Sequence, residues 1–190
     1  MKLLKVPHDN PKEVFAFYEP TPDIIELSDG VGSPYELIQK AIAHHFYADA
    51  VTFLAHGLPI RESIWWAAVC ADKRDDWNDN ERNAVTAAKS WVHSPDETTR
   101  RHAEEMAKLS TLNTGAGWAS QAAFWSGGSM TEPSAPIVPP PPYLYAQAVA
   151  GCINLTAVLP DGAKAEERYE LFLKIGLNLA RGGNGEIEGE

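Results

Sequence analysis

The chain has 190 residues, of which 44% are hydrophobic and 22% are charged, as expected for a globular protein of one domain with a sizeable core. Its 26 acidic and 16 basic residues give a formal net charge of −10, which argues against nucleic acid or an anionic membrane as the main partner. No apolar run approaches the roughly 18–20 residues that span a bilayer, and the N-terminus is too poor in apolar residues for a signal peptide. We therefore expect a cytoplasmic protein.

Residues 1–33 carry the least regular pattern of the chain. Four prolines punctuate them, and the run VFAFY at 14–18 is compatible with a short strand or with an apolar arm laid on the core. Aspartate and glycine at 29–32 form a turn signal. We expect a partly irregular N-terminal arm.

A strong helix start follows at SPYE, residues 33–36. Serine can cap the helix, proline suits the first helical position, and glutamate can reach back to the cap. This start predicts a helix to about residue 45. A second helix is predicted over 47–56, and Gly57 ends it.

The next predicted helix, over 58–74, is the element around which we expect the domain to pack. From Ile64 to Ala71 no side chain is polar, and Trp65 and Trp66 are adjacent. A helix that is apolar all round is buried on every side. We predict that this helix is central and that the two indoles are the hub of two packing layers.

Two further start signals predict the helices that follow. Asn78 and Glu81 have the spacing of a capping pair, which predicts a helix to about residue 92. The sequence SPDE at 94–97 repeats the earlier signal and predicts a helix to about residue 109.

The helix over 97–109 is the most polar one. Arg100 stands four residues before Glu104, and Arg101 stands four residues before Glu105. Pairs at this spacing on an exposed face contribute only a few tenths of a kcal/mol each. We predict that both pairs are solvated.

A tryptophan helix and a proline-rich segment come next. Trp118, Ala122 and Trp125 recur at helical spacing, so both indoles lie on one face. Two glycines at 127–128 end this helix. Residues 130–142 contain six prolines, which exclude a helix and a central strand and predict an extended, polyproline-like strap.

Two helices complete the chain. Residues 143–159 have three polar side chains and predict a second core helix, in which Gly151 lets another backbone approach closely. Residues 163–181 predict a last helix with one apolar and one charged face. The acidic tail 186–190 is expected to fray.

These patterns predict an all-α protein of about eight helices in antiparallel pairs, packed as a bundle or as a short solenoid-like stack. The predicted parts are the irregular arm 1–33, a single helical domain 34–185 that contains the strap, and the tail 186–190. The sequence has no strict internal repeat, so a true repeat protein is the lesser interpretation.

Few residues have the spacing that catalysis, metal binding or redox chemistry needs. The nearest approach to a metal cluster is His44, His45 and His56, but neighbours on one helix diverge by about 100°, which favours helix-end roles. An acid–base group would comprise His102, Glu104 and Glu105. These three lie on the most exposed predicted helix, where charged residues are routine. Because no motif for catalysis or for ligand binding is present, we expect no catalytic residue, metal or cofactor. Both cysteines, Cys70 and Cys152, stand in apolar stretches and are predicted to be buried small hydrophobes in preference to a disulfide or a reactive thiol.

Six tryptophans are more than a small core needs. Core packing is the simpler explanation, and a recognition groove is the functional one, because aromatic rings beside prolines make rigid contact surfaces. The groove would be formed by Trp77, Trp118, Trp125, Pro139, Pro140 and Pro141. The strap could equally be an internal cover over the indoles of the tryptophan helix.

Four motifs occur in order: LPxRExxWWA at 58–67, WASQAAFWSGGSM at 118–130, VPPPP at 138–142 and ARGGNG at 180–185. In these motifs the chain resembles an uncharacterised family of small bacterial proteins that are often encoded beside type VI secretion genes. The resemblance covers about residues 34–185. It implies an accessory role in the cytoplasm, such as an adaptor or chaperone that helps to load an effector or spike protein, and it supplies no catalytic residues.

The preferred hypothesis is therefore a non-enzymatic adaptor or chaperone whose partner is a protein, such as a secretion effector or spike component. The alternative is a helical domain with an inter-helix pocket that binds or processes a small molecule. That pocket would be lined by Tyr35, His45, Trp66, Gln147 and Asn154. A third hypothesis is a structural component of an oligomer, since the sequence leaves the oligomeric state open.

Overall fold

The computed structural model describes residues 2–187, which form ten helices and no strand. This confirms the all-α class, with two short helices more than the sequence predicts. The helices are α1 (Pro11–Phe15), α2 (Pro22–Leu27), α3 (Pro34–Ala43), α4 (Tyr47–Gly57), α5 (Ile60–Asp72), α6 (Asp79–His93), α7 (Glu97–Ser110), α8 (Gly115–Phe124), α9 (Leu144–Val158) and α10 (Ala165–Ala180). None of the described helices is both long and apolar enough to span a membrane.

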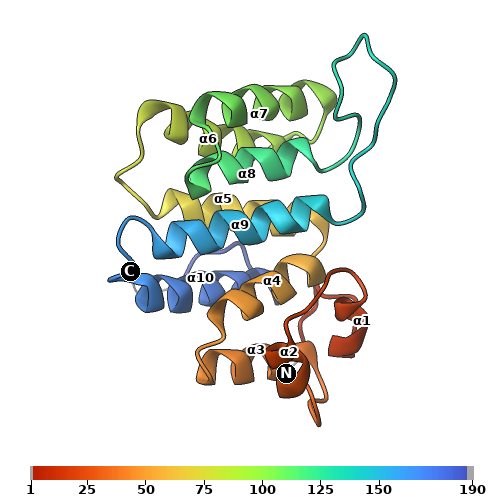
Figure 1. Ribbon diagram of the computed structural model, residues 1–190, viewed down its shortest axis with the longest axis vertical. Helices are drawn as coiled ribbons and strands as arrows, with labels where there is room; N and C mark the ends of the chain where they lie inside the picture. The colour runs from red at the N-terminus through yellow and green to blue at the C-terminus, as the bar shows by residue number, and fades with distance from the viewer. Residues whose placement is uncertain (1, 188–190) are drawn as a thin grey trace.

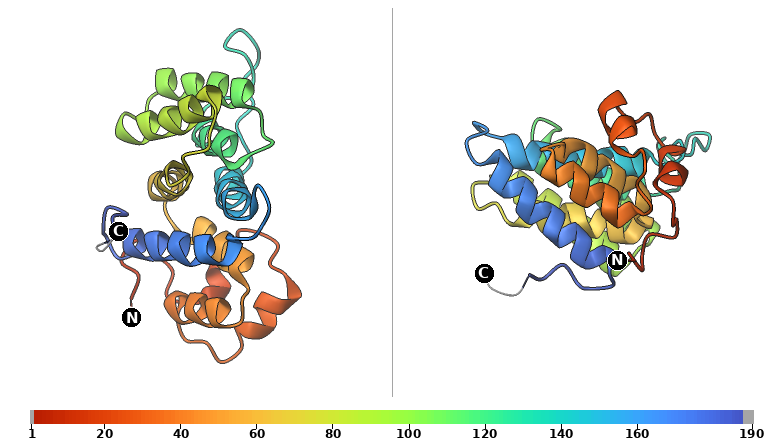
Figure 2. Two further views of the ribbon diagram at one scale, coloured as in Figure 1. Left: turned by 90° about the vertical axis from the view of Figure 1, so that its left-hand side faces the viewer. Right: turned by 90° about the horizontal axis from the view of Figure 1, so that it is seen from below.

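The helices are stacked in layers along the long axis of the molecule (Figure 1). Helices α6, α7 and α8 form one end, α5 and α9 form the middle, α4 and α10 lie below them, and α1, α2 and α3 form the other end. A side view shows α5 and α9 end-on while α10 runs across beneath them (Figure 2). The middle pair therefore joins the two ends of the molecule.

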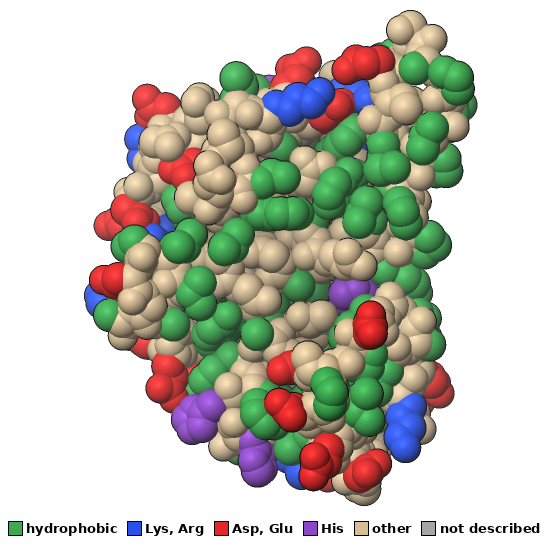
Figure 3. All heavy atoms as spheres, in the orientation of Figure 1, with side chains coloured by type: hydrophobic (Ala, Val, Ile, Leu, Met, Phe, Trp, Pro, Cys, Tyr) green, Lys and Arg blue, Asp and Glu red, His purple; other side chains and the backbone are tan. Residues whose placement is uncertain are grey.

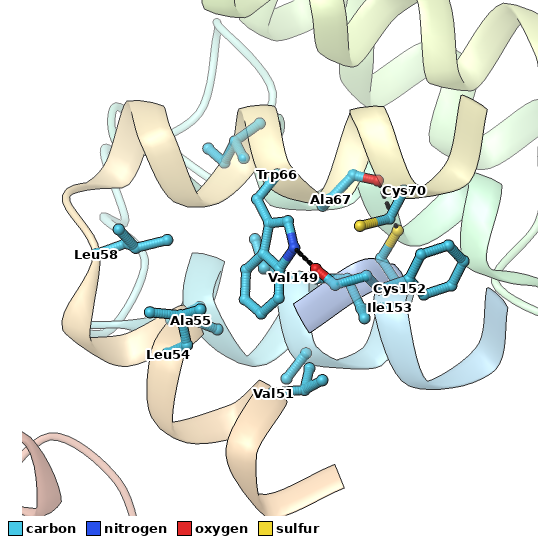
Figure 4. Packing of buried hydrophobic residues seen from close by; sticks show 14 of the residues in the cluster. Val51, Leu54, Ala55, Leu58, Trp66, Ala67, Cys70, Val149, Cys152 and Ile153 are labelled. Atoms are coloured by element: carbon cyan, nitrogen blue, oxygen red, sulfur yellow. Dashed lines mark hydrogen bonds between the residues drawn. The ribbon is translucent and has the colours of Figure 1, made fainter. Parts of the chain in front are cut away.

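Helix α5 is central, as its apolar sequence predicts, and Trp66 is its hub. The Trp66 side chain is completely buried, and its indole N–H donates to the Phe172 carbonyl oxygen of α10 at 2.7 Å. An ideal Cβ on Gly176 would lie 2.6 Å from the indole, so glycine allows α10 to approach the ring. Figure 4 shows the ring between α5 and side chains such as Leu54 and Val149.

Trp65 does not share this role. It is only partly buried, and its indole N–H donates to the Asn184 carbonyl oxygen at 2.9 Å. Its ring meets the edge of His93, with 5.4 Å between the ring centroids. The prediction of a double hub therefore holds for Trp66 alone, and Trp65 instead holds the segment that follows α10.

The two cysteines face each other across the α5–α9 layer (Figure 4). Cys70 and Cys152 are free and fully buried, which confirms that they pack as small hydrophobes. Burial raises the pKa of the Cys152 thiol to about 12 and raises the pKa of Cys70 well above its usual range. Both thiols therefore stay protonated at neutral pH.

The N-terminal arm is more regular than its sequence suggests. It contains α1 and α2, which begin at the capping side chains of Asn10 and Thr21 and have proline in their first turns. The strand considered for residues 14–18 is wrong, because Val14 and Phe15 complete α1 and no strand forms there. The apolar-arm alternative is confirmed, since Val14 is fully buried in the main core.

The start signal of α6 acts as predicted, through a reciprocal capping box, and Ser33 caps α3 as predicted. Glu36 accepts from the Gly32 N–H at 2.9 Å and not from the cap residue itself. The start predicted at Ser94 lies two residues too early. Ser94 still ends α6, because its N–H donates to the Ser90 carbonyl oxygen at 3.0 Å. Asp96 caps α7 instead, accepting from the Thr99 N–H at 2.9 Å.

The division into an arm, a domain and a tail stays a prediction. Leu3, Val6, Ile24 and Leu27 of the arm are buried in the same cluster as the helical domain. In the tail, Ile187 packs partly against this core. The last three positions of the tail, 188–190, lie outside the described residues.

Candidate protein-binding site

Residues 130–142 form a loop that projects from the body of the molecule between α8 and α9 (Figure 1, upper right). They contain neither helix nor strand, as their prolines predict, and residues 132–139 are exposed. The chain reverses within the loop, where the Ala135 N–H donates to the Glu132 carbonyl oxygen at 2.9 Å. The predicted non-helical strap is therefore a loop that turns back on itself, and we refer to this segment as the proline loop.

Hydrogen bonds close the base of the proline loop. The Met130 N–H donates to the Val138 carbonyl oxygen at 2.8 Å and so joins the outgoing and returning arms. The Ser129 hydroxyl oxygen accepts from the Val138 N–H at 3.0 Å, and the Thr131 hydroxyl donates to the Pro136 carbonyl oxygen at 2.6 Å. These contacts hold the loop in a defined conformation although it projects into solvent.

Arg100 of α7 anchors the beginning of this loop. The residue is only 4% exposed, and its guanidinium lies 4.9 Å from the centroid of the Phe124 ring. It donates to the Phe124 carbonyl oxygen at 2.9 Å and to the Ser129 carbonyl oxygen at 3.1 Å. Its other N–H groups bind Glu97 at 2.6 and 2.7 Å, a bidentate pairing that fixes the orientation of the guanidinium. Arg100 therefore ties the end of α8 and the start of the loop to α7.

Arg101 provides a second anchor. It donates to the Thr131 carbonyl oxygen at 2.8 Å, to Glu97 at 2.9 Å and to Glu104 at 2.9 Å. Its expected partner Glu105 is exposed, and neither arginine makes the ion pair predicted four residues along the helix. The predicted pairs are wrong because both guanidinium groups point toward the loop carbonyls and the shared carboxylate. We call Arg100, Arg101 and Glu97 the arginine clamp.

The electrostatics of the arginine clamp favour its charged form. The hydrogen bond from Arg100 lowers the pKa of Glu97 to about 2, against the opposing effect of desolvation and with help from Arg101. The carboxylate therefore remains ionised throughout the neutral range. The clamp is a fixed support for the loop, with its charges already engaged.

The returning arm of the proline loop presents large apolar side chains to solvent. Ile137 is 81% exposed and Val138 is 44% exposed. An apolar side chain held outward on an ordered loop loses little conformational freedom when a partner covers it, and so favours binding. Of the predicted prolines, which follow Val138 along the chain, Pro139 and Pro141 are exposed and Pro140 is partly exposed.

Trp118 and Trp125 share one face of α8, as their spacing predicts, and their rings meet edge to face with centroids 6.2 Å apart. Both are partly exposed, so the proline loop does not seal them as an internal cover. Trp118 lies over Gly151 of α9, where an added Cβ would be 3.5 Å from the indole. We predicted that Gly151 lets the backbone of another helix approach closely. It instead leaves room for the indole ring of Trp118. Figure 3 shows hydrophobic side chains gathered over α8 and α9 and continuing onto the loop.

Trp77 is not part of this surface. It is 6% exposed, its indole N–H donates to the Ala71 carbonyl oxygen at 2.7 Å, and the Arg74 guanidinium lies 5.0 Å from its ring centroid. A buried indole with its donor satisfied offers no contact area to a partner. Trp77 therefore closes the α5–α6 connection.

The histidines considered as metal ligands are held separately. His45 Nδ1 lies 3.0 Å from a Glu166 oxygen at the surface, and His56 Nδ1 bonds the Thr52 carbonyl oxygen at 2.7 Å within α4. Among the residues that the structure describes, no group of three His, Cys, Asp or Glu side chains is arranged to hold a metal ion.

The acid–base set predicted on α7 is also divided. Glu104 accepts from Arg101 at 2.9 Å and from Lys108 at 2.8 Å. His102 and Glu105 are exposed on the outer face of the helix. The three side chains therefore have separate surroundings, and Glu104 is the partner of Arg101.

The five residues proposed for an inter-helix pocket lie in different surroundings. Trp66 is enclosed in the core, and the Tyr35 ring lies beneath a guanidinium at 5.2 Å. Gln147 and His45 are exposed, and the buried Asn154 Oδ1 accepts no hydrogen bond from any described residue. The structure does not bring these residues to one site.

A cavity that the sequence did not indicate lies elsewhere. Its volume is about 560 Å³, and it lies between the N-terminal arm, the α4–α5 junction and the start of α9. His56 and Tyr143 contribute to its lining. Neither residue stands in a recognisable motif, because the cavity forms only when the arm folds against the end of α4. The folding of this arm was the least predictable part of the chain.

Comparison with known proteins places the chain in a family. No curated protein and no solved structure matches it significantly. The model of DUF6931, a family of unknown function, matches residues 37–180, which extend from α3 to the end of α10 and include the arginine clamp and the proline loop. Because this match covers well over half of the sequence, the chain belongs to the DUF6931 family.

Proposed function

We propose that this protein is a non-enzymatic, protein-binding accessory, an adaptor or chaperone, and that the proline loop is its main contact surface. The observation that carries the proposal is the outward position of Ile137 and Val138 on a loop whose base is hydrogen-bonded and clamped. Preorganised apolar residues of this kind are typical of the centres of protein interfaces.

The surface around the loop fits the same role. The partly exposed indoles of Trp118 and Trp125 lie on α8 just before the loop begins, and Pro139 and Pro141 continue the apolar area beyond Val138. Tryptophan and proline side chains lose little entropy when they are covered by a partner. Together these residues form a rigid apolar surface on one side of an acidic molecule.

The proposed biological setting is bacterial type VI secretion, with the protein acting in the cytoplasm to help load an effector or spike component. Support for this setting comes from the motif resemblance, carried by WASQAAFWSGGSM at 118–130 and VPPPP at 138–142. These motifs coincide with the tryptophan face and the proline loop. Two of the four motifs that carry the resemblance therefore lie in the proposed contact surface.

The test is site-specific photo-cross-linking in a bacterium that expresses the protein while its secretion system is assembled. A photoreactive residue at position 137 should cross-link to a secretion effector or to a spike or tip protein. Position 4 is the matched control, because Leu4 is 71% exposed and precedes Lys5, whose N–H donates to the Ala180 carbonyl oxygen at the end of α10, whereas the proline loop is clamped to α7.

The double substitution Ile137→Asp and Val138→Asp should remove this cross-linking partner in co-purification while the thermal unfolding temperature stays within about 2 °C, because exposed side chains contribute little to stability. Two results would overturn the proposal. One is the same set of cross-linked proteins at positions 137 and 4, and the other is recovery of no secretion component from assembled systems.

A further inference from the structure

The cavity beside the N-terminal arm has a mainly apolar and aromatic lining. Phe17 comes from the arm, Leu58 and Ile60 from the α4–α5 junction, and Pro142 and Tyr143 from the end of the proline loop. Its volume of about 560 Å³ is within the range of sites for small ligands. Figure 3 shows hydrophobic side chains continuing from the loop down to the arm on this side of the molecule, with histidine atoms among them.

The lining of this cavity is poor in charged side chains. It includes no Lys, Arg, Asp or Glu among the described residues, and one of its two histidines, His8, has its Nδ1 3.1 Å from a Glu13 oxygen. A charged ligand would lose its hydration here without gaining an opposite charge. The cavity therefore favours an uncharged group.

Aromatic rings are already stacked at its wall. The Phe17 and Tyr143 rings are nearly parallel, at 14°, with centroids 4.3 Å apart. Tyr143 has a left-handed backbone conformation, with φ of 60°, which is uncommon for a non-glycine residue and tends to occur where function requires it. This conformation places Tyr143 at the junction of the loop and α9, where its ring forms part of the cavity wall.

His56 contributes a polar group to the lining of the cavity. It is 2% exposed, and its ring stacks on Tyr18 at 4.5 Å between centroids. Its Nδ1 lies 2.7 Å from the Thr52 carbonyl oxygen, which can only accept, so the proton of the neutral imidazole is on Nδ1. Burial lowers the pKa of His56 and so favours this neutral form. Nε2, on the opposite side of the ring from Thr52, is therefore a buried acceptor.

Nε2 of His56 accepts no hydrogen bond from any described residue. A buried acceptor without a donor costs about 1–3 kcal/mol, so native proteins rarely leave one without a partner. A group that satisfies Nε2 brings an N–H or O–H donor, and in this cavity it lies beside aromatic and proline side chains.

We propose that this cavity binds an uncharged aromatic group that donates one hydrogen bond to Nε2 of His56, as an indole or a phenol can. Such a group could belong to a free small molecule or to a side chain of a bound protein. The lining of this site does not include Ile137 or Val138, so the site can be tested separately from the proposed adaptor function.

The test is an NMR titration of the full-length protein with indole and with benzofuran, which has the same bicyclic shape but no N–H donor. Indole should bind about three- to tenfold more tightly than benzofuran, the ratio expected for one net hydrogen bond. Shift changes should map to Phe17, His56 and Tyr143. N-acetyl-tryptophanamide forms a third arm, and its binding at the same site indicates that a protein side chain can be the source, whereas its exclusion indicates a free molecule.

The variant His56→Phe keeps an aromatic ring against Tyr18 and removes the acceptor, so it should bind indole and benzofuran equally. If this variant does not fold, the imidazole ¹⁵N resonances of the unmodified protein provide the readout, because indole but not benzofuran should shift Nε2. Equal binding of the two probes to the unmodified protein, or binding of neither, would overturn the proposal. The loop variant Ile137→Asp should bind indole normally, which separates this result from the adaptor test.

Discussion

At the scale of single residues, the stability of this molecule depends most on Trp66. We expect Trp66→Ala to lower the free energy of unfolding by about 3–5 kcal/mol, because the substitution leaves a large cavity that surrounding helices cannot fill. The side chain is fully buried, and its loss also removes the donor to the Phe172 carbonyl oxygen. Chemical denaturation followed by circular dichroism measures the change.

Trp65→Ala is the control for this prediction. The same atoms are removed from the adjacent position, but Trp65 is partly exposed and its indole bonds only the Asn184 carbonyl oxygen. Its cost should be clearly smaller than that of Trp66→Ala. Equal costs for the two variants would show that α5 is not organised around Trp66.

Single residues also show where prediction from the sequence succeeded and where it could not. The burial of Trp66 followed from an apolar run with no polar face, which is a local signal. Trp77 was predicted to line a recognition groove, but it is buried against the Arg74 guanidinium and the Ala71 carbonyl oxygen. These contacts exist only after the α5–α6 connection has folded, so the sequence could not show them. The same limit applies to His56, whose surroundings come from the arm and from α9.

At the scale of elements, the arginine clamp determines the conformation of the proline loop. We expect Arg100→Ala to increase amide hydrogen exchange at Met130 and Val138, because the Phe124 and Ser129 carbonyl oxygens lose their buried donor. The local cost should be about 1–3 kcal/mol. Hydrogen exchange measured by NMR reports the loop and the core separately.

The exposed Lys174 on α10 provides a charge-matched control for the clamp. Lys174→Ala removes one positive charge without touching the loop, so loop exchange should stay unchanged. Unchanged exchange at Met130 and Val138 in Arg100→Ala would mean that the internal bonds of the loop hold it without α7.

The clamp also predicts a dependence on pH. The folded-state pKa of Glu97 is about 2, below the ordinary value of 4.5, so its contribution to stability is complete above pH 4.5 and declines as the pH falls toward 2. Loop exchange, corrected for the intrinsic rate at each pH, should therefore rise across this range. In Glu97→Gln, loop exchange should no longer rise as the pH falls from 4.5 toward 2. If it still rises, other carboxyl groups are responsible for the pH dependence.

Several elements were predictable because their signals are local. Ser33 before Pro34 specifies the start of α3, and the spacing of Asn78 and Glu81 specifies the capping box of α6. The proline loop was predictable as non-helical, but its projection depends on carbonyl contacts to Arg100 from another element. The Arg100–Glu104 and Arg101–Glu105 ion pairs were predicted from α7 alone and do not form, because both arginines bind carbonyl oxygens of the loop and Glu97.

At the scale of the whole molecule, the middle layer of α5 and α9 connects the end formed by α6, α7 and α8, which holds the clamp and the loop, to an end formed by the N-terminal helices (Figure 1). The proline loop and the cavity of His56 meet at Tyr143, where the loop returns to α9. A partner on the loop and a ligand in the cavity would therefore contact neighbouring parts of one continuous segment.

The N-terminal arm tests whether the molecule behaves as one cooperative unit. Ile24 of α2 is fully buried in the same cluster as the middle layer, whereas the adjacent Ile25 is 47% exposed. We expect Ile24→Ala to lower the free energy of unfolding by about 2–5 kcal/mol and Ile25→Ala to change it by less than about 0.5 kcal/mol. For Ile24→Ala, unfolding monitored by tryptophan fluorescence and by far-ultraviolet circular dichroism should shift together in a single transition, because the arm completes the core. A separate early transition would instead support an arm that folds independently of the domain over 34–185.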